Sequence, residues 1–572
     1  MDSRPARSGI RWDLAAAAIF LVVALVFCWG ALWSGFQIGD DEHYEVTKAF
    51  LWSKGFSLYH DIWNDQQPLL TVLQGLLFKG IGVHAGTARG LALVFGALLV
   101  AGLFHLVRKC SGVPAAFVAM AGLLAAPHVF KLSLSPMTEL PAFAVGLWAL
   151  WAIRRWDRDG HGVWLVVSGL ALAVALEIKL TAVLLAPALA VELAVLTLAR
   201  PKPRKGVEIV RNLLVFGGSA LGGLFLMGLL LGADYGQAYR SHFAAVGPSA
   251  LAEIRQHAFT PPDLLKYRQA LLALAASLGL AAWRGHLKRI AFPLVLFATA
   301  LAVHLLYRPF WPFYYLHFAL PVAWLTGYVA GELWKSAASL RRPAWITAAS
   351  LLSAAVVVYA GLQLGPEIKA IRSERRIESD RIVAAMKAAA PQTRWVYTRS
   401  TMYAFHARLP VIPELAVMPK KRFWTGQITP PEIAAVVRRY RPEQLLLDDR
   451  DMADEDMARL VREDYTLACS EAGLSLWLRV DRRSRLLFPG DFPSRPDDEH
   501  QRIRLGVRAA KAEGIEPPVV PDLEIEELAA DLEFEPGADD EAEDHAFEGG
   551  LERASVAGGP RRVQQDVHGR PQ

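Results

Sequence analysis

Long apolar runs recur through the first two thirds of this 572-residue chain and limit what it can fold into. A helix needs about 20 apolar residues to cross the hydrocarbon core of a bilayer. The runs therefore predict about eleven transmembrane helices, at residues 13–34, 88–107, 112–130, 137–153, 162–178, 181–198, 208–231, 267–283, 290–307, 312–333 and 344–363. A mean hydropathy of +0.26 also favours a polytopic membrane protein over a soluble enzyme.

Basic residues collect at one end of successive runs. If the N-terminus is cytoplasmic, every inner connection carries Lys or Arg, at 108–109, 154–158, 200–211, 284–289 and 335–342. The loop 35–87, the turn at Lys179 and everything after residue 364 then lie on the outer side. The net charge of +5 belongs to these inner connections, so we predict no nucleic-acid partner.

Composition divides the chain into three parts. Residues 1–364 form the predicted transmembrane domain, whose first outer loop covers 35–87 and includes a short amphipathic segment expected at the membrane surface. Residues 365–480 have the pattern of a small α/β domain, with helices at 371–390 and 430–442 and strands at 394–398, 444–449 and around 465–480. Residues 481–572 are polar and then acidic, which predicts a disordered tail.

An acidic cluster, Asp40, Asp41 and Glu42, directly follows the first apolar run. One interpretation is structural: Asp40 caps a helix at about 41–54, and the next two acids offset the positive end of its dipole. The other is chemical: neighbouring carboxylates form a general base or a metal site, because like charges shift pKa values and oxygen ligands suit hard cations. Composition alone leaves both interpretations open.

Four further charges fall near the predicted outer boundary. Lys179 lies between two apolar runs, so it pairs with a neighbour such as Glu177, reaches the interface, or binds the phosphate of a lipid carrier. Glu139 opens a run, as a first-turn carboxylate or as a substrate contact. Arg89 is an interface anchor or a phosphate contact, which suits a planar guanidinium. Arg308 lies in a stretch typical of an aromatic belt.

Two motifs carry a family resemblance. GDDEHYEVTKAFLWSKG and HDIWNDQQPLLTVLQGLLFKGIG resemble the first outer loop of GT-C membrane glycosyltransferases, in particular the protein O-mannosyltransferases and aminoarabinose transferases. The matching residues are Asp41, Glu42, Tyr44, Asn64, Asp65, Pro68 and Leu69. Gln67 stands where many relatives have the first proline of a pair. The resemblance continues through SPMTELPAF and ALEIKLTAVLL and so covers most of residues 13–364.

The resemblance implies a fold and an activity. The expected fold is a polytopic α-helical bundle of the GT-C type followed by a small outer α/β domain. The expected activity is transfer of a hexose or pentose, with inversion, from a polyprenyl-phosphate donor to a protein, lipid or glycan acceptor. The protein would work at the non-cytoplasmic face of a bacterial-type inner membrane, in contact with membrane lipid.

The resemblance also implies roles for particular residues. Asp41 would be the general base, with Asp40 beside it, and Glu42 would support the site or help to hold a divalent cation that some relatives use. The implied substrate contacts are Arg89, Lys179, Glu139, Tyr44, Asp65 and Arg308. Arg89 and Lys179 would neutralise the lipid phosphate as it leaves. The alternative function is a transporter or flippase of lipid-linked sugars, which would need ionisable groups near the bilayer midplane.

Overall fold

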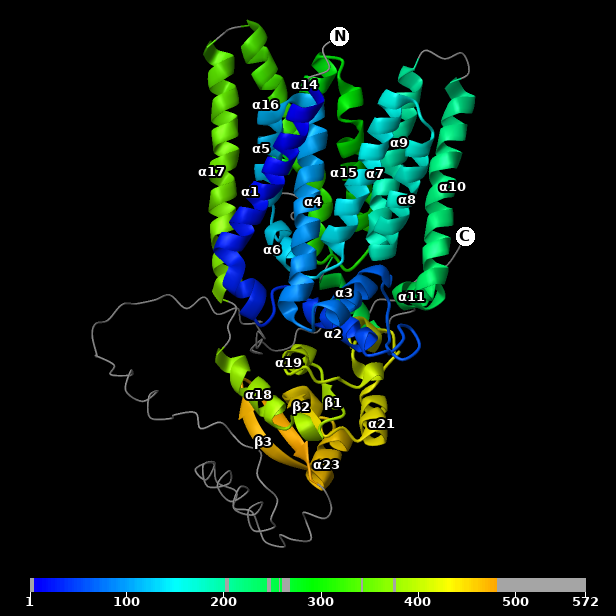
Figure 1. Cartoon of the computed structure of the whole chain (residues 1–572), viewed down its shortest axis with the longest axis vertical. Coiled ribbons are helices and arrows are strands. Elements are labelled where there is room, and N and C mark those ends of the chain that lie inside the picture. The colour runs from blue at the N-terminus through cyan, green and yellow to red at the C-terminus, as the bar shows by residue number, and fades with distance from the viewer. Residues whose placement is uncertain are drawn as a thin grey trace, which may run out of the picture. The chain divides into compact units, whose positions relative to one another are not determined.

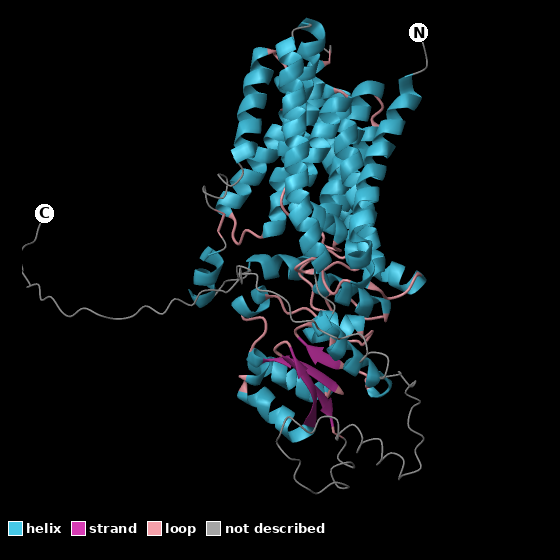
Figure 2. Ribbon diagram, turned by 90° about the vertical axis from the view of Figure 1, so that its left-hand side faces the viewer, coloured by secondary structure: helices cyan, strands magenta, loops and turns pink. Residues whose placement is uncertain are grey.

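The structure is a computed structural model that describes residues 5–200, 205–243, 248–256, 258–259, 268–340, 343–373 and 377–480. The predicted tail, residues 481–572, lies outside the described residues. The described part contains a bundle of long helices and a small α/β domain (Figure 1). Figure 2 shows the same division, with the strands confined to the smaller domain. The expected fold class is confirmed.

Each predicted apolar run overlaps a helix of the bundle. These helices are α1 (Pro5–Ser34), α4 (Ala85–Ser111), α5 (Val113–Leu124), α7 (Glu139–Asp159), α8 (Val163–Ile178), α9 (Leu185–Ala199), α10 (Lys205–Leu231), α14 (Arg268–Trp283), α15 (Ala291–Leu306), α16 (Tyr315–Leu340) and α17 (Pro343–Ser373). Among the described residues, five helical segments are long and apolar enough to cross a membrane. They are Arg11–Ser34, Ala85–Ser111, Leu180–Ala199, Lys205–Leu231 and Pro343–Ser373. The number of eleven spans stays a prediction.

Short helices connect the long ones. They are α2 (Glu42–Ser53), α3 (Leu69–Gly80), α6 (Val129–Leu134), η1 (Leu180–Leu184), α11 (Tyr235–Phe243), α12 (Pro248–Gln256), η2 (Leu287–Arg289) and η3 (Pro312–Tyr314). The predicted span 112–130 differs from the structure, because α5 ends at Leu124 and α6 follows a turn at His128, whose φ is 64°. A helix of 12 residues is only about 18 Å long. The run is therefore divided into two short helices.

Small residues let two helices of the bundle approach closely. A Cβ added at Gly327 of α16 would lie 2.7 Å from the carbonyl oxygen of Ala115 in α5. One added at Gly331 would lie 2.6 Å from the Cβ of Ser111 at the end of α4. Close backbone approach at small residues is typical of helix packing in membranes, where lipid supplies no hydrophobic drive between helices.

The α/β domain is built on a four-stranded sheet. Its strands are β1 (Val396–Thr398), β2 (Gln444–Asp448), β3 (Tyr465–Glu471) and β4 (Leu474–Arg479), in the order β1-β2-β4-β3. Its helices are α18 (Ile377–Ala388), η4 (Ala390–Gln392), α19 (Thr401–His406), η5 (Pro413–Leu415), α20 (Lys420–Trp424), α21 (Pro430–Tyr440), α22 (Asp449–Met452) and α23 (Glu455–Asp464). β1 pairs with β2 in parallel, and the other pairs are antiparallel. The predicted strands are confirmed, whereas α19, η5, α20, α22 and α23 were not predicted.

The first loop joins the bundle to the α/β domain. α2 and α3 lie at the end of the bundle where α1 ends and α4 begins (Figure 1). Leu51 and Ile62 of the loop are buried in one hydrophobic cluster with Val396 and Leu446 of the sheet. The loop therefore has fixed contacts on both sides, which is the condition for holding side chains in a defined geometry.

Candidate functional site

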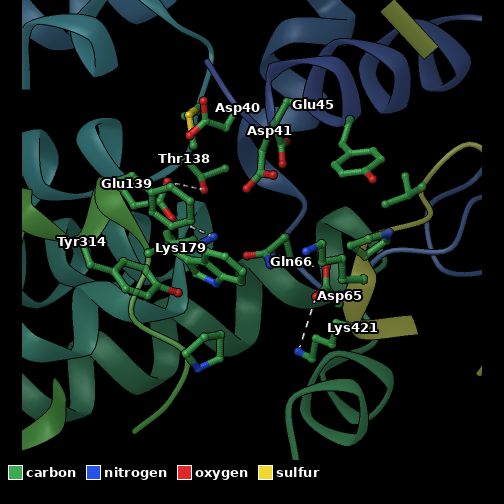
Figure 3. A pocket seen from close by; sticks show the side chains of 18 of the residues that line it. Asp40, Asp41, Glu45, Asp65, Gln66, Thr138, Glu139, Lys179, Tyr314 and Lys421 are labelled. Carbon is green, nitrogen blue, oxygen red and sulfur yellow. Dashed lines mark hydrogen bonds and ion pairs between the residues drawn. The ribbon is translucent and has the colours of Figure 1, made fainter. Parts of the chain in front are cut away.

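A cavity of about 440 Å³ is lined by the first loop, the adjoining end of the bundle and the α/β domain. Seven of the sequence-predicted site residues line it: Asp40, Asp41, Tyr44, Asp65, Glu139, Lys179 and Arg308. Glu42 and Arg89 lie outside it, in a separate buried contact. Figure 3 shows Asp41, Glu139 and Lys179 around the same space, with Asp65 and Lys421 across from them.

Asp41 is the residue at the N-cap of α2, yet its side chain makes no capping hydrogen bond within the described part of the chain. Glu42, the first residue of α2, turns back to the preceding segment, where its Oε2 accepts from the backbone N–H groups of Ile38 at 2.5 Å and Gly39 at 3.1 Å. The prediction that Asp40 caps this helix is therefore wrong. The Asp41 carboxylate remains directed at the cavity.

Burial raises the pKa of Asp41 to about 7. The positive charge of Lys179 opposes this shift, and the negative charges of Glu139, Glu45 and Asp40 add to it. Asp40 differs from its neighbour, because its side chain is 67% exposed and lies 3.4 Å from the Nζ of Lys131. Of the two aspartates, Asp41 has the environment of a general base near neutral pH.

Lys179 and Glu139 form an ion pair at the cavity wall. The Nζ of Lys179 lies 3.0 Å from the Oε1 of Glu139, and the two side chains are 12% and 1% exposed. Glu139 is the first residue of α7, and Lys179 is the residue that follows α8. Glu177, the partner considered from the sequence, instead accepts a hydrogen bond of 2.6 Å from the Tyr235 hydroxyl. Lys179 is therefore held by an acid from another helix.

Arg308 lies between α15 and η3, in the aromatic stretch, and its side chain is exposed. Tyr307, Trp311 and Tyr314 line the cavity beside it. Within the described ranges Arg308 has no acidic partner at ion-pair distance. Its guanidinium is thus able to bind an anionic ligand without first breaking an ion pair.

The α/β domain contributes a cation that the sequence analysis did not single out. Lys421 of α20 lines the cavity, and its Nζ lies 3.5 Å from the Oδ2 of Asp65. Burial lowers the pKa of Lys421 to about 8, although Asp65 opposes the shift. The basic sequence PKKRFW at 419–424 was the available signal, but nothing local indicates that it contacts the first loop.

Tyr44 links α2 to the same segment of the α/β domain. Its hydroxyl donates to the carbonyl oxygen of Met418 at 3.1 Å. Within the loop, the buried Nζ of Lys48 donates to Glu45 at 2.9 Å and to Asn64 at 3.2 Å. Glu45 and Lys48 also line the cavity and were not singled out from the sequence. These contacts hold the loop segments that carry Asp41 and Asp65.

Arg89 and Glu42 form a fully enclosed pair. The Nε of Arg89 lies 2.6 Å from the Oε1 of Glu42, and neither side chain is exposed. The Nη1 of Arg89 donates to the carbonyl oxygens of Ala31, Leu32 and Gly35 at the end of α1. Arg89 therefore satisfies carbonyl groups that a helix C-terminus leaves unpaired. The structure does not bring Arg89 or Glu42 to the cavity, where their predicted roles would require them.

The donor set offers little to a divalent cation. Glu42, the residue expected to help hold one, is already engaged by Arg89 and by two backbone N–H groups. No group of three or more His, Cys, Asp and Glu side chains in the described ranges is arranged to hold a metal ion.

The chain resembles known proteins in part of its sequence and in its fold. Residues 65–216 match the model of a family described as dolichyl-phosphate-mannose-protein mannosyltransferase. Two similar solved structures are ArnT from Cupriavidus metallidurans in the apo state and the same protein bound to undecaprenyl phosphate. The apo structure gives a TM-score of 0.56 at 14% identity and covers 81% of this chain and 97% of ArnT.

The chain has the GT-C fold. The ArnT structure bound to undecaprenyl phosphate gives a TM-score of 0.55 at 14% identity, covering 81% of this chain and 98% of that one. Both alignments extend over nearly the whole of ArnT. No curated protein sequence gives a significant match. The GT-C resemblance expected from the sequence is confirmed.

Proposed function

We propose that this protein is a glycosyltransferase that moves a sugar from a polyprenyl-phosphate donor to an acceptor. The observation that supports this most directly is Asp41, whose carboxylate makes no capping hydrogen bond to the described residues and shares one cavity with the cations Lys179 and Arg308. This transfer requires a base for the acceptor and a cationic site for the donor phosphate in the same cavity. The matched family is named for a dolichyl-phosphate sugar, and a similar solved structure is bound to undecaprenyl phosphate, which supports the class of donor.

Asp41 acts on the acceptor. Its carboxylate removes the proton of the acceptor hydroxyl as the oxygen attacks the anomeric carbon of the sugar. A pKa of about 7 suits this step, because the carboxylate is partly ionised at neutral pH and is a stronger base than an ordinary aspartate. Asp40 lies at the exposed edge, paired with Lys131, and contributes negative charge rather than the base itself.

Lys179 and Arg308 act on the donor. As the bond between the anomeric carbon and the phosphate oxygen breaks, negative charge grows on the leaving phosphate. Cations placed before the reaction stabilise that charge. Glu139 holds Lys179 at the cavity wall and balances its charge. Attack from the Asp41 side, opposite the phosphate, inverts the configuration of the sugar.

The location of the cavity supports a reaction at the membrane interface. It is lined by the first loop and the α/β domain, and the distribution of Lys and Arg predicts that both lie on the non-cytoplasmic side. A lipid-linked donor and a polar acceptor meet only where the bilayer ends. We infer an integral protein of a bacterial-type inner membrane whose acceptor is a protein, lipid or glycan.

The test is sugar transfer by the purified full chain in detergent, with a panel of polyprenyl-phosphate sugars. Asp41→Asn removes the base but keeps the shape, and we expect transfer to fall by roughly 10²- to 10⁴-fold. Asp61→Asn is the matched control. Asp61 lies in the same loop but does not line the cavity, and its carboxylate accepts hydrogen bonds from the amide and the hydroxyl of Ser57. The control should transfer sugar like the wild type.

Two outcomes would overturn the proposal. One is undiminished transfer by Asp41→Asn, which would remove Asp41 from the reaction. The other is no turnover of any donor by the wild type while lipid-linked sugar still crosses proteoliposome membranes. That second result would favour the transporter or flippase over the enzyme.

A further inference from the structure

Lys179 stands at a break between two helical segments. α8 ends at Ile178, Lys179 is extended with φ −154° and ψ 128°, and η1 begins at Leu180. An extended residue interrupts the series of hydrogen bonds in which each amide pairs with the carbonyl four residues earlier. The amide of Leu180 must therefore find an acceptor elsewhere, because a buried N–H group without one is costly, above all next to lipid.

Gln67 of the first loop supplies that acceptor. Its Oε1 accepts a hydrogen bond of 3.0 Å from the Leu180 amide. Gln67 is 6% exposed and precedes Pro68, the N-cap residue of α3. A residue before proline is restricted to extended conformations, so the backbone that carries this side chain has little freedom. Gln66 lines the cavity, whereas Gln67 lies outside it and contacts the break at Leu180.

We propose that Gln67 is a positioning residue that holds Lys179 at the site of the donor phosphate. The inference rests on the proposed function, in which Lys179 binds that phosphate. The hydrogen bond to Leu180 stabilises the break, and the break directs Lys179 into the cavity toward Glu139. No other part of the reaction is assigned to Gln67.

The competing local structure explains why the acceptor matters. If α8 continued by one turn, the Leu180 amide would pair with the carbonyl of Leu176 and would need no side chain. Lys179 would then have helical rather than extended dihedral angles, and its side chain would project in another direction. The hydrogen bond to Gln67 favours the interrupted helix, because in a continuous helix the Leu180 amide would already be paired with Leu176.

The hydrogen bond between Gln67 and Leu180 also connects the first loop to the segment that carries Lys179. Gln67 belongs to the loop that carries Asp41 and Asp65, and Leu180 belongs to the segment that carries Lys179. Loss of the contact should therefore weaken donor binding and misalign the donor with the base. A misplacement on the scale of an ångström costs up to about 100-fold in rate.

The experiment measures equilibrium binding of a sugar-free polyprenyl phosphate and the KM and kcat for a polyprenyl-phosphate sugar. For Gln67→Met, which keeps the length but lacks the acceptor, we expect roughly tenfold weaker binding and a raised KM. Gln67→Glu keeps an acceptor oxygen and should bind more tightly than Gln67→Met, although its added negative charge opposes the phosphate. Gln74→Met is the matched control, because Gln74 is a buried amide in α3 that donates to Pro136 outside the cavity.

The outcomes separate this inference from the proposed function when Lys179→Gln is measured beside it. Wild-type binding in Gln67→Met, with binding lost in Lys179→Gln, would overturn only the role of Gln67. Equal losses in Gln67→Met and Gln74→Met, or no recovery in Gln67→Glu, would also overturn it. Wild-type binding in Lys179→Gln would overturn the phosphate site itself. Thermal melting of each variant establishes that it is folded.

Discussion

Two buried acid–base pairs of similar length have different surroundings. Arg89 and Glu42 are 2.6 Å apart, and Lys179 and Glu139 are 3.0 Å apart. Neither side chain of the first pair is exposed, and Arg89 also donates to carbonyl oxygens at the end of α1. The second pair lies at the cavity wall, where Lys179 keeps some exposure.

The difference shows what makes a charge structural or functional in this fold. A guanidinium whose donors all point into protein holds helices together and has no capacity for a ligand. An ammonium at a cavity wall has three donors, so it can keep its acid partner and still bind a phosphate. The proposed function uses the second pair and leaves the first to the framework. Variants of Arg89, Glu42, Glu139 and Arg308 test whether the two pairs differ in this way.

The largest effect is expected in the enclosed pair. Arg89→Met would leave Glu42 as an uncompensated buried charge and would free carbonyl groups at the end of α1. Breaking a buried pair from one side typically destabilises by about 3–5 kcal/mol. We expect a strongly lowered melting temperature in detergent, while any folded fraction keeps the wild-type KM for the donor.

The double variant Arg89→Met with Glu42→Gln is the control. Removing both charges avoids the uncompensated carboxylate, so part of the lost stability should return. The framework role of this pair fails if Arg89→Met melts like the wild type but no longer binds a polyprenyl phosphate. In that case Arg89 would reach the donor after all.

The sequence could predict the fold and most of the residues that line the cavity, but it could not show that Asp41 lines the cavity while Glu42 lies outside it. Apolar runs report the helices directly, because their length is set by the bilayer. Adjacent residues at the start of a helix, however, point about 100° apart. Whether Asp41 or Glu42 faces the cavity depends on where α2 begins and on Arg89 of α4, which forms an ion pair with Glu42.

Contacts between distant segments escaped the sequence analysis for a related reason. Lys421 faces Asp65 only because the α/β domain packs on the first loop, and no local pattern encodes that packing. In the sequence, Gln67 is only a departure from the family motif. Its hydrogen bond to the Leu180 amide is a contact between distant segments that the structure reveals. Burial and direction are properties of the tertiary structure, whereas residue type and spacing are properties of the sequence.

A smaller effect is expected for Arg308, which lines the cavity. Arg308→Gln removes an exposed cation of the cavity that forms no ion pair with the described residues, so the melting temperature should stay near that of the wild type. The KM for the donor should rise about tenfold, the loss expected for one charged hydrogen bond to a phosphate. Transfer rates measured over a range of donor concentrations separate the two quantities. An unchanged KM would remove Arg308 from the phosphate site.

The smallest effect concerns the pH dependence of transfer. The base must be ionised, so kcat/KM should rise with pH up to about 7, the pKa of Asp41. Glu139 raises this pKa, so Glu139→Gln should lower it and move the rising limb to lower pH. A shift of less than one pH unit changes the rate at a fixed acidic pH by less than about tenfold. The measurement is kcat/KM as a function of pH for the wild type and Glu139→Gln, and the quantity compared is the pH at the midpoint of the rise rather than the maximum rate.

Glu42→Gln completes this test of the comparison. Glu42 adjoins Asp41 in the sequence, but the charges that most affect the pKa of Asp41 among the described residues are Lys179, Glu139, Glu45 and Asp40. The folded fraction of Glu42→Gln should therefore keep the limb where the wild type has it, although its stability falls. A limb that moves in Glu42→Gln and stays in place in Glu139→Gln would reverse the assignment of the two pairs. The site would then be organised by the neighbour of Asp41 in the sequence rather than by its neighbours across the cavity.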